Sequence, residues 1–134
     1  MNYKTGGVTI IEAAIKVLDE NDQELVEALE AVGIRRNVAT IIVYLKDLDE
    51  ATSRDIEKGS GLRQPEVSIA MRPLREKGWI GERDVKGTGK GRPMRFYKLT
   101  ASIDDIIGHY EEEKRSESSR AMQFIEKLKE MSAT

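Results

Sequence analysis

The 134-residue chain contains no cysteine, one histidine and few aromatic residues, which make up 5% of it. The absence of cysteine excludes disulfide bonds, thiolate metal sites and cysteine nucleophiles. The single histidine, His109, excludes a metal site built from several histidines of one chain. Long apolar runs and a signal-peptide pattern are also missing. We therefore expect a cytoplasmic protein that makes no membrane contact and needs no metal or other cofactor.

Charged residues make up 34% of the chain, and their signs are unevenly distributed. Residues 60–98 contain ten Lys/Arg and four Asp/Glu, whereas residues 1–51 contain five Lys/Arg and ten Asp/Glu. Residues 99–134 are also acidic, so the net charge of −2 conceals one strongly basic segment. A phosphate backbone responds to local charge rather than to the total, and the basic segment is therefore a candidate nucleic-acid surface.

Helical periodicity predicts three helices before the basic segment. The first begins at Thr9, which forms a capping box with Glu12, and Asn21-Asp22 is expected to break it after Leu18. The second has an acidic outer face and is expected to end at Gly33.

The third helix, expected near residues 36–48, has the most apolar pattern in the chain and is predicted to be the central core element. Asp47, Asp49 and Glu50 close it, although acids are unfavourable at the negative end of a helix dipole. We therefore expect a neighbouring cation to compensate them.

Residues 52–76 show the pattern of two short helices joined by a tight turn. Thr52-Ser53-Arg54-Asp55 fits the capping box that opens a helix. Gly59 and Gly61 are expected to allow the turn, and Pro65 suits the first turn of the second helix. The apolar positions at helical spacing form the expected buried face of that helix: Val67, Ala70, Met71 and Leu74.

Pro73 interrupts the second helix, because a proline in a helix interior removes a hydrogen bond and costs roughly 3 kcal/mol. The helix either kinks at this point or ends there. The continued apolar period at Leu74 favours the kink.

The outward face of the second helix carries side chains of the kind that bind DNA. Glutamine pairs with adenine, arginine with guanine, and glutamate accepts from cytosine. Glu66 has two interpretations: a first-turn acid favoured by the helix dipole, or a carboxylate that penalises wrong base sequences. The predicted base-reading residues are Gln64, Glu66 and Ser68, and the residues predicted to bind bases or phosphates are Arg63, Arg72 and Arg75.

Two strands, beginning at Trp79-Ile80 and at Phe96, are predicted to form a hairpin. The loop between them contains three glycines and lacks the spacing of a phosphate-binding loop, which opens a helix rather than joining two strands. Such a wing is expected to lie along the DNA backbone or to insert an arginine into a narrow minor groove. Its predicted DNA-binding cations are Lys86, Lys90, Arg92 and Arg95.

A long helix capped by Ser102 is predicted at the C-terminal end. It carries two apolar stripes, one from Ile103 to Tyr110 and one from Ala121 to Met131, separated by a charged segment. Either two chains pair along these stripes, or the helix folds back on its own chain. Paired DNA-reading units match two-fold DNA sites, which favours a homodimer.

Residues 36–99 resemble the winged-helix domain of prokaryotic transcriptional regulators of the broad MarR, ArsR and TrmB type. The string LRQPEVSIAMRPLREKGWI (62–80), with the GKGRP wing, is most similar to small archaeal regulators. The resemblance implies an archaeal protein that binds DNA as a dimer through the helix at residues 64–75. Pro73 departs from the family pattern and puts contacts beyond Arg72 in doubt.

The predicted fold is mainly α with a small β-hairpin. We predict a winged helix-turn-helix with an N-terminal helical extension (1–35), a DNA-binding domain (36–100) and a C-terminal dimerisation helix (101–134). The predicted function is sequence-specific transcriptional regulation on double-stranded DNA, without enzymatic activity. The alternative is a winged-helix protein-interaction module in a transcription or RNA-processing assembly, which would not need a cationic glycine loop. The residues identify no small-molecule effector.

Overall fold

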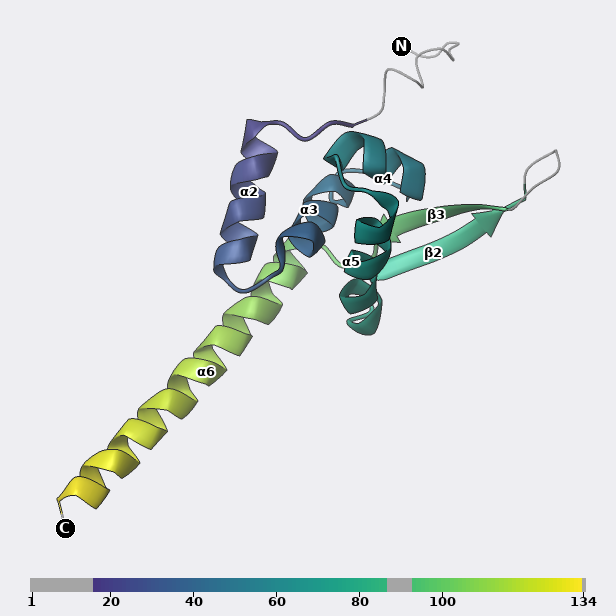
Figure 1. The fold of residues 1–134 in the computed structure, drawn as a ribbon. Helices are drawn as coiled ribbons and strands as arrows, with labels where there is room; N and C mark the ends of the chain where they lie inside the picture. The colour runs from purple at the N-terminus through teal and green to yellow at the C-terminus, as the bar shows by residue number, and fades with distance from the viewer. Residues whose placement is uncertain (1–15, 87–92, 134) are drawn as a thin grey trace. The chain divides into compact units, whose positions relative to one another are not determined.

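The computed structural model describes residues 16–86 and 93–133 (Figure 1). The chain divides into two compact units between Ala101 and Ser102. The elements of the first unit are α2 (Glu20–Ala31), α3 (Arg36–Leu45), β1 (Ala51–Thr52), α4 (Ser53–Ser60), α5 (Gln64–Glu76), β2 (Ile80–Val85) and β3 (Met94–Leu99). The second unit contains the single long helix α6 (Ile103–Ser132).

Helix α2 begins at Glu20, one residue before the helix break that the sequence predicted at Asn21-Asp22. Asp19 is its N-cap: the Asp19 carboxylate accepts from the Asp22 backbone N–H at 2.8 Å, and the Asp19 N–H donates to the Asp22 carboxylate at 3.0 Å. The prediction of a break at Asn21-Asp22 was wrong, because an acid three residues after a capping Asp closes a capping box. Residues 16–18 are not helical, and the predicted cap at Thr9 lies outside the described residues.

Helix α3 is the centre of the core, as its pattern predicted. Its residues 38–45 are all buried, and it contacts α2, α4, α5 and β3. The buried Tyr44 hydroxyl donates to the Asp55 carbonyl at 3.0 Å, which ties α3 to α4. The expected cation is present at the carboxyl end of α3: Lys16 Nζ donates to the Val43 carbonyl at 3.1 Å and lies 3.7 Å from the Asp47 carboxylate.

Helices α4 and α5 form the predicted helix-turn-helix pair. The Thr52 side chain accepts from the Asp55 N–H, and the Asp55 carboxylate accepts from the Thr52 N–H, both at 3.1 Å. Gly61 makes the turn with a positive φ of 79°. Gly59 has a different role from the one expected: it lies within α4, where an added Cβ would meet Tyr44 Cε1 at 2.2 Å. Gly59 therefore permits close packing of α4 rather than the turn.

Helix α5 continues through Pro73 to Glu76, so the alternative in which the helix ends before Pro73 was wrong. Met71 and Leu74, on either side of the proline, are both buried. Their packing against the core holds the two parts of the helix together although the proline lacks one N–H donor.

The sheet has three antiparallel strands in the order β1-β3-β2. The predicted hairpin is formed by β2 and β3, with Ile80 opposite Leu99 and Val85 opposite Met94. The sequence did not predict β1, which pairs Ala51 with Tyr97 at the other edge of β3. The order α3-β1-α4-α5-β2-β3 is that of a winged helix-turn-helix, which confirms the predicted fold class.

Helix α6 is one continuous helix, as predicted. Ser102 caps it by accepting from the Asp105 N–H at 3.0 Å. Ile106 is the one α6 residue that is buried in the described part of the chain, and residues 111–133 are exposed along their whole length. In residues 16–86 and 93–133, no helix is long and apolar enough to cross a membrane.

Candidate nucleic-acid interface

Helix α5 is fixed by its inner face and presents its outer face to solvent. Its four buried apolar residues are at most 3% exposed: Val67, Ala70, Met71 and Leu74. Because a helix turns every 3.6 residues, the positions between these anchors point away from the core. The exposed predicted contact residues of α5 and its N-cap are Arg63, Gln64, Ser68, Arg72 and Arg75.

Glu66 is half-buried and acts at the start of α5. Its carboxylate accepts a hydrogen bond from the Arg63 backbone N–H at 2.8 Å, and the Arg63 guanidinium lies 4.0 Å away. A carboxylate in this position satisfies an N–H that a helix start otherwise leaves without a partner. This contact matches the first of the two interpretations of Glu66, an acid in the first turn that stabilises the start of the helix.

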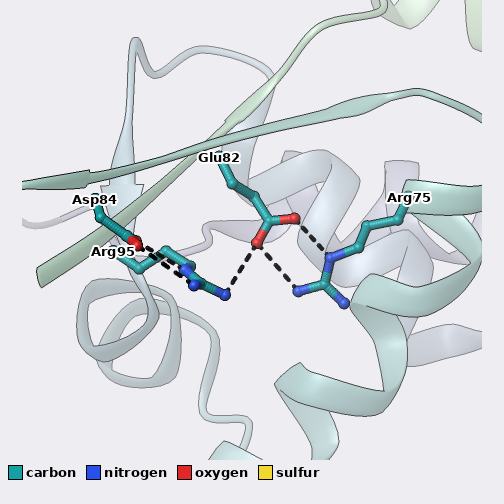
Figure 2. A network of polar contacts seen from close by, with 4 residues as sticks. All are labelled: Arg75, Glu82, Asp84 and Arg95. Atoms are coloured by element: carbon teal, nitrogen blue, oxygen red, sulfur yellow. Dashed lines mark hydrogen bonds and ion pairs between the residues drawn. The ribbon is translucent and has the colours of Figure 1, made fainter. Parts of the chain in front are cut away.

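Two predicted DNA-binding arginines meet at one acid between α5 and the hairpin (Figure 2). The Arg75 guanidinium donates twice to the Glu82 carboxylate, at 2.6 and 3.2 Å. Arg95 donates to the same carboxylate at 3.5 Å and to Asp84 at 2.9 Å. We call these four residues the wing network. It joins the helix that carries Arg75 to both strands of the hairpin.

Strand register explains why the wing network forms. Asp84 is directly opposite Arg95, and Glu82 is directly opposite Tyr97. Opposite residues of an antiparallel pair lie on the same face, and Tyr97 is buried. Glu82, Asp84 and Arg95 therefore share the face of the sheet that packs on the helices.

The wing network also sets the ionisation of its acids. The hydrogen bond from Arg75 holds the pKa of Glu82 below its ordinary value, and the hydrogen bond from Arg95 does the same for the pKa of Asp84. Both acids remain ionised at neutral pH and offset the charges of Arg75 and Arg95. Positive charge counted in the sequence is thus partly neutralised within the folded wing.

A third arginine is held on the opposite face of the hairpin. Arg83 Nε donates to the Glu50 carboxylate at 2.5 Å, and its guanidinium lies 4.9 Å from the centre of the Phe96 ring. Arg83 donates a second bond to Glu50 at 2.6 Å, so the pair is bidentate. This contact links the hairpin to the segment that precedes β1.

Two predicted DNA-binding cations remain open to a ligand in the part of the basic segment that the structure describes. Arg72 and Lys86 are exposed and form no ion pair among those residues. Lys77, another cation of the segment, lies 5.7 Å from the centre of the Trp79 ring. Lys90 and Arg92, predicted at the wing tip, lie outside the described residues.

Sequence reasoning placed Ile69 on the outward face but did not choose it as a contact residue. The structure leaves its side chain 58% exposed, one turn before Arg72 on the same face. Its position on the side of α5 opposite the apolar stripe could have identified Ile69 as a contact residue from the sequence alone. In the described residues, no group of three or more His, Asp or Glu side chains could hold a metal ion.

No protein-family model matches this sequence, and no curated protein matches it. A solved structure that aligns with the chain is that of MepR, a transcription regulator of the Staphylococcus aureus multidrug efflux pump MepA. The TM-score is 0.47 and the sequence identity is 20%, over 92% of this chain and 91% of the MepR chain. An identity this low assigns no function to the chain.

Proposed function

We propose that the chain is a sequence-specific DNA-binding transcription regulator that inserts α5 into the major groove. One observation carries the proposal: the outer face of α5 is exposed and, apart from Ile69, mostly polar, while its inner face is fixed by four buried side chains. An α-helix fits the major groove, where each base pair presents a distinct pattern of donors and acceptors.

Within this proposal, Gln64 and Ser68 read base edges and Arg63 and Arg72 bind bases or phosphates. Gln64 and Ser68 are at i and i+4, so they lie on the same side of α5 and reach neighbouring base pairs. Glu66 positions the start of the helix through its bond to the Arg63 N–H. Residues near the N-terminal end of a DNA-reading helix make most base contacts.

The hairpin acts as the wing. Lys86 and the tip residues Lys90 and Arg92 bind the phosphate backbone or enter the minor groove. Arg75 and Arg95 belong to the same surface, and each guanidinium has five N–H donors, of which the acids use only some. These two arginines therefore contact phosphate as second partners while they hold the wing at its angle to α5.

The proposed assembly is a homodimer on a two-fold site of double-stranded DNA. The exposed apolar residues of α6 supply the dimer contact, including Phe124, Leu128 and Met131, which are 59–63% exposed in one chain. A regulator of this kind works in the cytoplasm and performs no catalysis. The archaeal origin remains a prediction from the sequence resemblance.

Salt dependence of DNA binding tests the proposal. The affinity for a random duplex should fall steeply between about 50 and 200 mM salt, because each neutralised phosphate contributes about −0.9 to the slope of log K against log salt. Arg115→Ala on α6, where Arg115 pairs with Glu111, is the matched control and should leave the slope unchanged. A binding constant independent of salt would overturn the proposal.

One observation favours the second candidate, a protein-interaction module. Ile69 places an apolar side chain at the centre of the exposed α5 face, where a protein partner would bury it. On DNA the same side chain contacts a thymine methyl group. Selection of bound sites from random DNA distinguishes the two: enrichment of a defined motif supports DNA reading, and no enrichment supports the protein partner.

A further inference from the structure

We propose that α6 pairs with α6 of a second copy in antiparallel orientation, with Lys114 opposite the partner's Glu117. This inference rests on the homodimer of the proposed function and adds its orientation and register. The exposed surface of α6 carries it, together with the order of charges along that surface.

Seven apolar residues of α6, together with Lys114 and Glu117 between them, fall on one seven-residue repeat. Successive residues of this repeat are alternately four and three positions apart, which is the spacing of the seam between two paired helices. The seam positions are Ile103, Ile107, Tyr110, Lys114, Glu117, Ala121, Phe124, Leu128 and Met131. Ile107 is 48% exposed and Leu128 is 63% exposed, so both ends of the seam are accessible in one chain.

The centre of the seam is charged rather than apolar. Lys114 Nζ lies 3.4 Å from the Glu117 carboxylate, and the two side chains are 47% and 58% exposed. A parallel pair in register would place Lys114 against the partner's Lys114 and Glu117 against the partner's Glu117. Like charges at a helix interface repel each other and lose hydration. The antiparallel pair instead sets each lysine against a glutamate.

Matching Lys114 with the partner's Glu117 fixes every other seam contact. Tyr110 then faces the partner's Ala121, and Ile107 faces the partner's Phe124. The surface of α6 is hollowed around Ala121, in a depression lined by Glu113, Ser116, Glu117, Arg120, Ala121 and Phe124. A large aromatic side chain therefore meets a small one at a depression that can receive it.

A flanking charge pair supports the same register. Each seven-residue repeat has two seam residues, and Lys114 and Ala121 are the first of the two in successive repeats. In an antiparallel pair, a residue that directly precedes such a first seam residue faces a residue at the same repeat position on the partner. Here Glu113 faces the partner's Arg120, and symmetry repeats the contact. Arg120 forms no ion pair with any described residue of its own chain. The seam contacts and the flanking Glu113–Arg120 pairs are therefore both satisfied by the same antiparallel register.

The orientation has a measurable consequence for the helix ends. In this register Ser102 lies opposite the partner's Lys129. With a rise of 1.5 Å per residue, the two Ser102 residues are about 40 Å apart. A parallel pair would bring the same two residues to within about 10 Å of each other.

Disulfide formation tests the register directly, because the 134-residue chain contains no cysteine. The single variants Lys114→Cys and Glu117→Cys are mixed, oxidised and identified by mass. The expected product is the mixed disulfide, because cysteines must have Cα atoms within about 7 Å to be bridged. Predominant homodisulfides would establish a parallel pair and overturn the proposal, as would a dimer that gives no disulfide or a chain that remains monomeric.

Charge reversal supplies an independent measurement. Lys114→Glu should raise the dimer dissociation constant at least tenfold in sedimentation equilibrium, and the double variant K114E/E117K should restore it. Arg115→Glu, one residue away but outside the seam, is the matched control and should change the constant little. An unchanged constant for Lys114→Glu would overturn the antiparallel register.

The two proposals fail separately. If the mixed disulfide forms but the chain shows no salt-dependent DNA binding, the proposed function fails and the register stands. If the chain binds DNA with the expected salt slope but gives homodisulfides, only the antiparallel register fails.

Discussion

The outer face of α5 and the β2–β3 hairpin both carry arginines, but the structure places their charges in different environments. Arg72 on α5 is exposed and forms no ion pair among the described residues. On the hairpin, Arg83 and Arg95 lie 2.5 and 2.9 Å from carboxylate oxygens. The comparison shows that the number of cations in a segment is an upper limit on the charge available to phosphate.

The difference follows from the geometry of the two elements. In a strand pair, opposite residues share a face, so an acid on β2 meets an arginine on β3 directly. On α5 the positions three and four residues from Arg72 are Ser68, Ile69, Arg75 and Glu76, and Glu76, the acid among them, forms no ion pair with Arg72. On α5, Arg72 therefore stays exposed, whereas Arg75 at the C-terminal end of the helix joins the arginines of the hairpin strands in holding the wing in place.

The largest expected effect comes from the wing tip. Lys90→Ala combined with Arg92→Ala should weaken binding to all sequences on the order of fiftyfold at about 0.1 M salt, and should flatten the salt slope by about 1.8. Filter binding or fluorescence anisotropy on random and cognate duplexes measures both. A change in base preference without a change in slope would count against contact between the tip and the backbone.

Gln64→Ala tests base reading by α5 with a smaller effect. The variant should lose about 1–3 kcal/mol on its cognate site, because a bidentate contact to one base is removed. Binding to random duplex DNA should be unchanged, and Lys129→Ala on α6 is a suitable control. Equal loss on all DNA would show that Gln64 positions the helix rather than reading a base.

Most of the fold was predictable from local patterns. The capping box at Thr52, the N-cap at Ser102, the apolar period of α3 and the turn at Gly61 each depend on residues close in sequence. The errors have the same origin. Asn21 and Asp22 were interpreted as a break because Asp19, the capping partner of Asp22, was not recognised as the N-cap of a new helix.

The candidate site was less predictable because its contacts join distant segments. Arg83 and Glu50 are 33 residues apart, and Arg95 and Asp84 meet only through strand register. The strand β1 has two residues and depends on pairing with β3 rather than on its own pattern. Side-chain exposure on α5 followed from its buried stripe, whereas neutralisation of the hairpin arginines required tertiary structure.

Arg72 and Arg95 provide the sharpest test of the comparison. Arg72→Ala should reduce the affinity for DNA about tenfold and flatten the salt slope by about 0.9, since it removes one unpaired phosphate contact. The charge exchange D84R/R95D keeps the pair and the net charge, and should leave affinity within a factor of about three. If the exchange weakens binding as much as Arg72→Ala, Arg95 contributes as much to phosphate binding as Arg72 does, and the two regions do not differ.

Ile69→Ala should cost about 1 kcal/mol on sites that contain a thymine at the contacted position and nothing on other sites. Its free energy of unfolding should change by less than about 0.5 kcal/mol, because the side chain is 58% exposed. Competition binding with thymine-to-uracil substitutions, which remove the methyl group, provides the measurement. An equal loss on thymine and uracil sites would remove Ile69 from base reading.

The smallest effect is expected at Glu82, whose carboxylate binds Arg75 of α5 and Arg95 of the hairpin. Glu82→Gln should lower the free energy of unfolding at pH 7 by about 0.2–1 kcal/mol, the usual contribution of an ion pair near the surface. Because Arg75 lowers the pKa of Glu82 below its ordinary value of 4.5, this contribution is fully present above that value and is lost as the pH falls through the lowered pKa. Urea unfolding of both proteins between pH 7 and pH 3 should therefore give curves that differ by a constant amount above about pH 5 and converge in acid. A difference that does not shrink in acid would show that the charge of Glu82 does not stabilise the wing, and the hairpin arginines would then be as available to phosphate as Arg72.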